Sequence, residues 1–158
     1  MSYTIRKANL NDTAALTDLI LGLGWFAHYF EHLSGDEACQ RVGEHLNQCL
    51  ADASHSIYVA AADTAAQIVG YTAVHWLPYL FLPGPEGFVS ELFVADAARG
   101  QGLGGQLLQT VVQEALARQC RRLSLLNMRG RASYQRGFYV KQGWEERLDA
   151  ANFVLTFR

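Results

Sequence analysis

One segment, residues 89–105, places the strongest constraint on how this chain folds. It begins with the apolar run Val89–Val94, which suits a β-strand, and passes through a five-residue link into a turn with four closely spaced glycines. A long amphipathic stretch follows the glycines and predicts a helix. A glycine-rich turn at a helix N-terminus can present several backbone N–H groups to one anion, and the helix dipole adds positive charge there.

The turn itself has the composition of a pyrophosphate site. Side chains would hold a phosphate away from the backbone amides, so glycine suits these positions. An arginine beside them adds a full charge and a planar fork of donors. We therefore predict that the following residues bind a pyrophosphate: Arg99, Gly100, Gln101, Gly102, Leu103, Gly104 and Gly105.

One interpretation of these glycines is a dinucleotide-binding loop. Gly100-x-Gly102-x-x-Gly105 satisfies the fingerprint GxGxxG. That fingerprint follows its strand directly and has an acidic residue roughly 20 positions later to bind the ribose. Here the link Ala95–Arg99 intervenes and residues 120–127 contain no acid, so the pattern disfavours a dinucleotide.

Composition narrows the class of protein. The chain has 158 residues, 50% of them hydrophobic, and a net charge of −2, which argues against a nucleic-acid partner. No apolar run approaches the roughly 18 residues of a membrane span, and the N-terminus lacks the order of a signal peptide. The three cysteines form no CxxC pair and are typical of reduced thiols. We expect one domain over residues 1–158, cytoplasmic, with neither nucleic acid nor membrane as partner.

Hydrophobic periodicity and turn residues predict a mixed α/β (α+β) fold. Strands are expected at 3–8, 56–62, 67–76, 88–94, 122–126 and 152–157, with a further short strand near Trp144, and a hairpin turn at 63–66. Helices are expected from residue 12 to 23, from Ser34 to 50, from 103 to 116 and from 131 to 142. Ser34 and Glu37 have the spacing of a capping box. This order gives a central sheet of about six or seven strands with about four helices.

Two motifs resemble those of the GNAT N-acetyltransferase family. Arg99-x-x-Gly102-x-Gly104 is similar to the acyl-CoA loop of the family, Gln/Arg-x-x-Gly-x-Gly/Ala. Downstream, Phe138-Tyr139-Val-Lys-Gln-Gly143-Trp144 resembles the family segment Phe-Tyr-x-Lys-x-Gly-Phe, with tryptophan for the last phenylalanine. The order of elements over essentially the whole chain resembles the GNAT fold. The resemblance implies direct transfer of an acetyl group from acetyl-CoA to a primary amine in a ternary complex.

The resemblance also implies roles for the strand before the glycines. In the GNAT fold this strand parts from its neighbour, and its exposed backbone pairs with the pantetheine arm of the cofactor; Leu92, Phe93 and Val94 occupy those positions. Glu91 is a charge inside the apolar run and must meet water, a partner or a substrate. It resembles the strand glutamate that some members use as a base through water. The alternative is a partly exposed structural glutamate.

The downstream motif carries the second catalytic candidate. Tyr139 matches the tyrosine that, in many members, lies near the sulfur and protonates it; a core tyrosine is the alternative. Many members have asparagine seven residues before this tyrosine, where this chain has Ala132. Asn127, which ends the preceding strand, is the candidate replacement. Gln135 lies on the same predicted helical stripe as Tyr139 and is also assigned to cofactor binding.

Aromatic residues in two segments indicate which kind of amine binds at the acceptor side of the active site. Trp25, Phe26 and Tyr29 follow the first helix, and His75 and Trp76 end the strand before a proline-rich loop. Such rings can hold an apolar body or a cationic amine. We expect a small-molecule amine with an apolar portion, with a peptide or protein amine as the alternative acceptor. Some rings can instead belong to the core or to a homodimer contact.

One motif matches a zinc-binding signature, but the residues around it disfavour a metal site. His28-Tyr-Phe-Glu31-His32 matches the zinc signature H-x-x-E-H, which needs both histidines on one stable helix and a distant third ligand. Gly22, Gly24 and Gly35 flank the segment, so no metal is expected. The rival to an enzyme is a non-catalytic acyl-CoA-binding sensor or partner module, and the presence of Glu91 and Tyr139 favours the enzyme.

Overall fold

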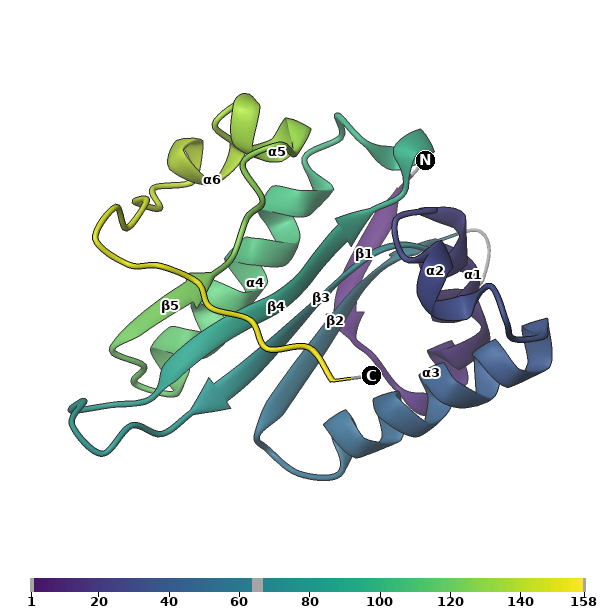
Figure 1. The fold of residues 1–158 in the computed structure, drawn as a ribbon, viewed down its shortest axis with the longest axis horizontal. Coiled ribbons are helices and arrows are strands. Elements are labelled where there is room, and N and C mark those ends of the chain that lie inside the picture. The colour runs from purple at the N-terminus through teal and green to yellow at the C-terminus, as the bar shows by residue number, and fades with distance from the viewer. Residues whose placement is uncertain (1, 64–66, 158) are drawn as a thin grey trace. The chain divides into compact units, whose positions relative to one another are not determined.

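Five strands form one mixed sheet in the order β1-β2-β3-β4-β5, which is also their order along the chain (Figure 1). The first four strands pair antiparallel, and β5 runs parallel to β4. The strands are β1 Tyr3–Lys7, β2 His55–Ala62, β3 Ile68–Leu77, β4 Glu86–Val94 and β5 Arg122–Leu125. The mixed α/β class is therefore confirmed, with five strands rather than six or seven over the described residues.

The computed structural model describes residues 2–63 and 67–157. The chain divides into two units, Met1–Leu125 and Leu126–Arg158. The first unit holds the whole sheet and the helices α1 Thr13–Gly22, α2 Ala27–Phe30, α3 Gly35–Leu50 and α4 Leu103–Ala117, with the short 3-10 helices η1 Leu10–Asp12 and η2 Asp96–Ala98. Part of the expected hairpin turn at 63–66 lies outside the described residues.

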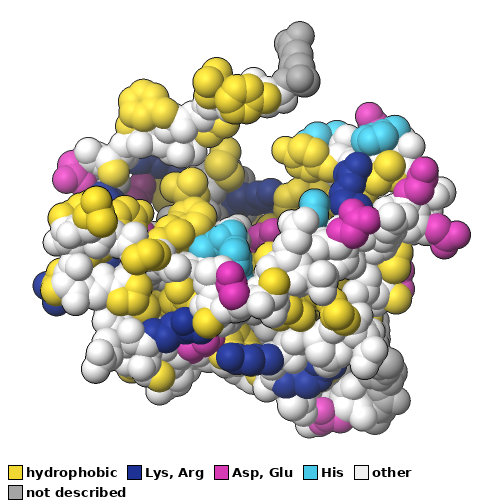
Figure 2. Space-filling model, turned by 90° about the horizontal axis from the view of Figure 1, so that it is seen from below, with side chains coloured by type: hydrophobic (Ala, Val, Ile, Leu, Met, Phe, Trp, Pro, Cys, Tyr) yellow, Lys and Arg dark blue, Asp and Glu magenta, His cyan; other side chains and the backbone are white. Residues whose placement is uncertain are grey.

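Hydrophobic side chains also remain on the surface. On the face drawn in Figure 2 they lie among charged and histidine side chains. In the β3–β4 loop Leu80 and Phe81 are exposed, and the ring of Phe81 makes an edge contact with Tyr79. Over the described residues, no helix combines the length and the apolar character that crossing a membrane requires.

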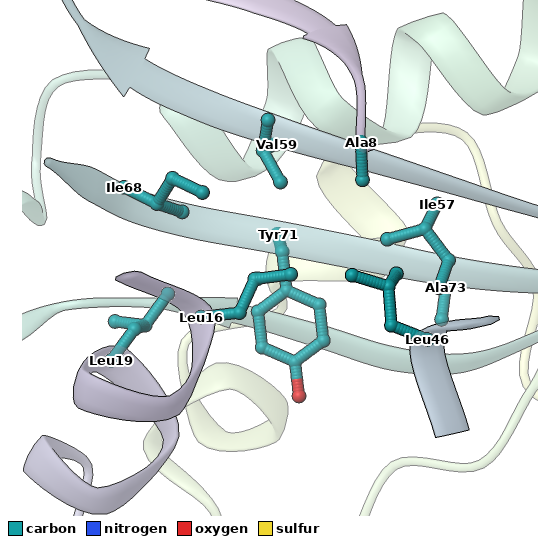
Figure 3. Packing of buried hydrophobic residues seen from close by; sticks show 9 residues of the cluster. All are labelled: Ala8, Leu16, Leu19, Leu46, Ile57, Val59, Ile68, Tyr71 and Ala73. Atoms are coloured by element: carbon teal, nitrogen blue, oxygen red, sulfur yellow. The ribbon is translucent and has the colours of Figure 1, made fainter. Parts of the chain in front are cut away.

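Helices cover both faces of the sheet (Figure 1). On one face α4 buries Leu107 and Val111 completely, because its apolar residues recur at helical spacing. On the other face α1 and α3 pack over β2 and β3. The core on that side, drawn in Figure 3, includes Leu16, Leu19, Leu46, Ile57, Val59, Tyr71 and Ala73.

The start of α3 confirms the predicted capping box. The Ser34 hydroxyl accepts a hydrogen bond from the Glu37 backbone N–H at 3.2 Å, and the Glu37 carboxylate accepts one from the Ser34 N–H at 2.7 Å. Two helix N-terminal donors are thereby satisfied.

The second unit corrects two predictions. The helix expected at 131–142 is broken into α5 Ala132–Gln135 and α6 Phe138–Lys141, because Gly137 takes a left-handed backbone conformation with φ of 65°. The stripe shared by Gln135 and Tyr139 therefore does not exist as a continuous helix face. Helices in the described chain number six rather than about four, since α2, α5 and α6 are single turns.

The strands expected at 152–157 and near Trp144 are also absent from the described residues. The side chains of Phe153 and Phe157 are 92% and 86% exposed. Alternating apolar residues predict a half-buried strand, but a strand also needs a neighbouring edge that completes its backbone hydrogen bonds. Here no ladder forms, so the pattern alone gave the wrong structure.

A half-buried carboxylate connects α4 to the sheet. Glu114 of α4 accepts hydrogen bonds from the Ser56 hydroxyl at 2.8 Å, the Tyr58 hydroxyl at 2.7 Å and the Arg118 Nε at 3.0 Å. Burial by itself raises the pKa of Glu114, but these hydrogen bonds and the charge of Lys7 leave the pKa below its usual value. The network fixes the α4 face of the sheet with charge-assisted hydrogen bonds.

Replacing Glu114 by glutamine should change how stability depends on pH. A carboxyl group with a lowered folded-state pKa stabilises the fold above its unfolded value, about 4.3, and this contribution is lost as pH falls through the folded-state pKa. We expect Glu114→Gln to lower the free energy of unfolding at pH 7 by about 1–3 kcal/mol and to flatten its acid dependence. Urea unfolding between pH 7 and 3 measures both. Glu44→Gln, which removes an exposed carboxylate outside the network, controls for the loss of one charge; an unflattened Glu114→Gln curve would contradict the assignment.

Candidate active site

The glycine turn between β4 and α4 has the geometry of an anion cradle. Gly100 and Gly102 both have φ of 76°, a left-handed conformation that L side chains rarely adopt. A Cβ at Gly100 meets nothing within 4 Å, and one at Gly102 meets only the Gln106 Nε2 at 3.8 Å. Gly102 is the N-cap of α4 and supplies no side-chain acceptor, so the first-turn amides have no acceptor within the helix or from the cap side chain. The residues present fit a pyrophosphate.

Arg99 stands beside the turn and is held by three partners. Its guanidinium pairs with Asp96 at 2.7 Å and donates from Nε to the Val94 carbonyl at 3.3 Å. It also lies over the ring of Trp25, 5.2 Å from the centroid. Arg99 is exposed, so it can still reach a ligand.

Strand β4 is paired on both sides over only part of its length. Its residues Glu86–Val89 pair with β5, whereas the antiparallel ladder with β3 continues to Val94. Within the described residues, the stretch Ser90–Val94 therefore has no partner strand on the β5 side. This parting of the strands, expected from the family resemblance, leaves the backbone edge of Leu92, Phe93 and Val94 unpaired as it runs toward the glycine turn.

A β-bulge sets the direction of the Glu91 side chain. Ala73 pairs with Glu91 while Val74 pairs with Val89, so Ser90 is an extra residue in β4. A bulge reverses the usual alternation, because two residues of one strand face one residue of the other. Glu91 therefore lies on the same sheet face as α1 and α3, opposite Ala73, and it is exposed.

Several titratable side chains gather around Glu91. Burial, then the charge of Glu91 and a hydrogen bond with it, raise the pKa of the Tyr71 hydroxyl far above its usual value. Burial and the charge of Glu91 also raise the pKa of the Cys49 thiol. The pKa of His75 is lowered by burial and by the neighbouring His55, with Glu91 opposing that change. A carboxylate and an imidazole with a lowered pKa therefore lie on the same face of the sheet.

The histidines form a polar chain at this edge. The rings of His55 and His75 meet edge to face with centroids 4.5 Å apart. The His75 Nε2 lies 2.9 Å from the Ser90 hydroxyl, and the His55 Nδ1 lies 2.7 Å from the Ser54 hydroxyl. No sequence motif pointed to Ser90, Tyr71 or His55 as residues of the site. Their position near Glu91 and His75 follows only from the strand register, which places His55 opposite His75.

The aromatic connection after α1 packs on the same strand. The rings of Trp25 and Phe26 make edge contacts with Phe93, at centroid distances of 5.6 and 5.1 Å. Tyr29 is 58% exposed and its ring contacts that of His28. The structure thus brings Trp25 and Phe26 beside the glycine-loop strand.

Trp76 lies on the other face of the sheet. It is buried, its indole N–H donates to the Ser56 hydroxyl at 3.0 Å, and the Arg118 guanidinium lies 4.7 Å from its ring centroid. Adjacent residues of a strand point to opposite faces. His75 faces the same side of the sheet as Glu91, whereas Trp76 faces α4. The predicted assignment of Trp76 to the acceptor-binding residues is therefore not supported by its position.

The second unit holds the remaining predicted residues. Tyr139 is half-buried, with its ring in edge contact with Phe138 and Trp144, and burial raises the pKa of its hydroxyl. It is therefore protonated at neutral pH. Asn127 accepts a hydrogen bond from the Ser133 hydroxyl at 3.1 Å, and Gln135 is exposed.

The H-x-x-E-H segment does not lie on one helix. Helix α2 ends at Phe30, so it carries His28 but not His32. In the part of the chain that the structure describes, no three His, Cys, Asp or Glu side chains form a group that could hold a metal ion.

Comparison with known proteins identifies the class. The family model described as the acetyltransferase (GNAT) family matches residues 23–144, which span both the glycine turn and the Tyr139 motif. The chain therefore belongs to the GNAT acetyltransferase family. No curated protein sequence matches it.

Solved structures agree on the fold. A transcriptional regulator from Bacillus halodurans superposes with a TM-score of 0.82 at 22% identity, over 99% of this chain and 100% of that one. Glucosamine-6-phosphate N-acetyltransferase from Arabidopsis thaliana gives 0.77 at 18%, over 100% of both chains. An aminoglycoside acetyltransferase from an uncultured soil sample gives 0.74 at 20%, over 99% and 97%. At these identities the likeness shows the fold alone.

Replacing Gly102 by alanine tests the cradle. A Cβ there enters space in which only the Gln106 Nε2 lies within 4 Å, and it also strains the backbone, since φ is 76°. We expect calorimetry to show acetyl-CoA affinity weakened at least about tenfold, equal to 1.4 kcal/mol. Gly143→Ala is the matched control, because its φ is 85° and a Cβ there meets nothing within 4 Å. Unchanged affinity in a folded Gly102→Ala protein would overturn the assignment of the turn.

Proposed function

We propose that this protein transfers an acetyl group from acetyl-CoA to a primary amine of a small molecule. The observation that carries the proposal is the half-paired strand β4, whose open edge runs into the glycine turn. An extended pantetheine arm can add to such an edge as a further strand does, by backbone hydrogen bonds. The turn that follows suits the pyrophosphate at the other end of the same arm.

The cofactor contacts proposed here follow from that geometry. The backbone of Leu92–Val94 would hold the pantetheine, and the amides of Gly100–Gly105 with Arg99 would hold the pyrophosphate. Asn127 and Gln135 remain proposed contacts from the family resemblance. The domain over residues 1–158 is proposed to act as one catalytic unit.

Acyl transfer to an amine requires two proton movements. The amine nitrogen attacks the thioester carbonyl carbon, the C–S bond breaks, and the nitrogen loses one proton while the sulfur gains one. Free backbone N–H groups of β4 are suited to stabilise the developing oxyanion. Glu91 is proposed to take the amine proton, through water. Tyr139 is proposed to donate its hydroxyl proton to the sulfur, which its raised pKa keeps available at neutral pH.

The acceptor side is proposed to lie over the Glu91 face of the sheet. Trp25 and Phe26 pack on Phe93 there, and Tyr29 offers an exposed ring. The face of Trp25 already carries Arg99, so Tyr29 is the ring of this connection more open to an acceptor. A carboxylate on the strand against which Trp25 packs favours a cationic amine with an apolar portion.

A non-catalytic acyl-CoA binder is the second candidate. One of the similar folds carries the name of a transcriptional regulator, while two others are named as acetyltransferases of an aminoglycoside and of glucosamine 6-phosphate. The two candidates differ in one measurement, the release of free CoA thiol in the presence of amines. A binder shows affinity for acetyl-CoA without amine-dependent release, and that result would overturn the proposal.

The choice of amine tests the acceptor side. In a panel of tryptamine-like, polyamine, aminoglycoside and peptide acceptors, we expect the best turnover on the amine with an aromatic portion. Tyr29→Ala should raise KM for that amine at least about threefold, since an aromatic contact contributes about 0.5–1.5 kcal/mol. The KM for a simple alkylamine serves as the internal control and should be the same in Tyr29→Ala as in the wild-type protein. Best turnover on a hydrophilic polycation, unaffected by Tyr29→Ala, would exclude the aromatic acceptor side.

Tyr139→Phe tests the proposed acid. The ring keeps its contacts with Phe138 and Trp144, and only the hydroxyl is lost. Loss of a general acid typically lowers kcat by about 10² to 10⁴. We expect that fall with an unchanged Kd for acetyl-CoA, measured by calorimetry. Full activity of Tyr139→Phe would contradict the proposed acid and leave Tyr139 with a packing role only.

A further inference from the structure

We infer that Tyr71 is a positioning residue that holds the Glu91 carboxylate in place for proton transfer. The inference rests on the proposed function and adds to it a residue that no motif of the sequence contains. Tyr71 lies on β3 and is buried, with only 5% of its surface exposed. Figure 3 shows its ring reaching from the sheet into the layer of Leu16 and Leu46, with the hydroxyl at the far end.

The Tyr71 hydroxyl is a polar group in an apolar cluster. Its neighbours in the core include Leu16, Leu46 and Ala73, none of which has a side-chain hydrogen-bond acceptor. An unpaired hydroxyl in such a place costs free energy, so it must find a partner. The strand register places Glu91 on the same face of the sheet, two residues before Phe93, which lies directly opposite Tyr71. An aromatic side chain can reach such a diagonal neighbour, so we assign the Glu91 carboxylate as the partner. The raised pKa of the Tyr71 hydroxyl, caused first by burial and then by Glu91, agrees with this assignment.

A second residue of β3 holds the backbone of Glu91. The fully buried Thr72 donates from its hydroxyl to the Glu91 carbonyl at 2.9 Å. Because Thr72 and Tyr71 are adjacent in the strand, their side chains leave the sheet on opposite faces. Glu91 is therefore held from one face through its backbone and from the other through its carboxylate.

This arrangement compensates for the bulge. The extra residue Ser90 loosens the ladder at the point where Glu91 must be oriented. A carboxylate has two oxygens and about four lone-pair sites, so accepting one hydrogen bond from Tyr71 leaves capacity for water or an amine. Tyr71 acts through Glu91 and touches no reacting atom.

The sheet offers a matched control on its other face. Tyr58 of β2 also donates its hydroxyl to a glutamate, Glu114, at 2.7 Å. Tyr58→Phe and Tyr71→Phe each remove one tyrosine–glutamate hydrogen bond and keep the ring. A merely structural role predicts the same outcome for both variants, a loss of stability without a specific loss of rate.

A double-mutant cycle tests the inference with the intact protein. We expect Tyr71→Phe to lower kcat at least about fivefold with Kd for acetyl-CoA unchanged, and Tyr58→Phe to leave kcat within about twofold. In the Glu91→Gln background, Tyr71→Phe should have no further effect on kcat. An equal loss in both backgrounds, or no loss in either, would overturn the inference.

A second measurement does not depend on activity. The carbon NMR shift of the Tyr71 ring Cζ should follow the protonation of Glu91 in the wild-type protein and lose that pH response in Glu91→Gln. If the wild-type protein shows this response but no amine-dependent thiol release, the proposed function fails while the contact stands. If thiol release is present and the Cζ shift ignores Glu91, the positioning role fails alone.

Discussion

The bulged pairing of β3 with β4 is the constraint on which the rest of the site depends. One extra residue, Ser90, separates two stretches of regular antiparallel ladder. Before the bulge, Phe88 faces the same side of the sheet as His75, and after it Glu91 does so too, although regular alternation places residues three apart on opposite faces. The Glu91 carboxylate, the His75 imidazole and aromatic rings therefore lie on one face of the sheet. Without the bulge, these groups would be divided between its two faces.

The end of β5 has a complementary effect on the same strand. Because β5 pairs with only the first four residues of β4, the backbone groups of the later residues have no partner strand along that edge. Unpaired strand edges usually favour aggregation, and proteins tend to cover them. Here the open edge leads into a turn whose N-cap residue supplies no side-chain acceptor to the first amides of α4. The unpaired strand edge and this helix start are therefore joined by one short link. The GNAT family to which the chain belongs is consistent with both.

The sequence was sufficient wherever a local rule decides the structure. The glycine turn, the capping box of Ser34 and Glu37, and the helix α4 all follow from spacing within a few residues. The bulge was not predictable, because nothing in Ser90 distinguishes an inserted residue from a paired one. The burial of Trp76 against Arg118 was missed for a related reason: the pattern near a strand end did not say which face the indole takes. The segment 152–157 failed because alternation describes one strand, and a strand needs a neighbour.

The ion pair of Arg99 with Asp96 has a consequence for how the turn meets a polyanion. The two charges nearly cancel, so little net positive field extends from this side chain into solvent. Long-range attraction, which salt weakens within about 10 Å at 0.1 M, then contributes little to capture. Recognition then depends on short-range donors, the backbone amides and the Arg99 guanidinium itself, which act only on contact. The turn is therefore suited to select its ligand by the fit of these close contacts, with little long-range steering from this side chain.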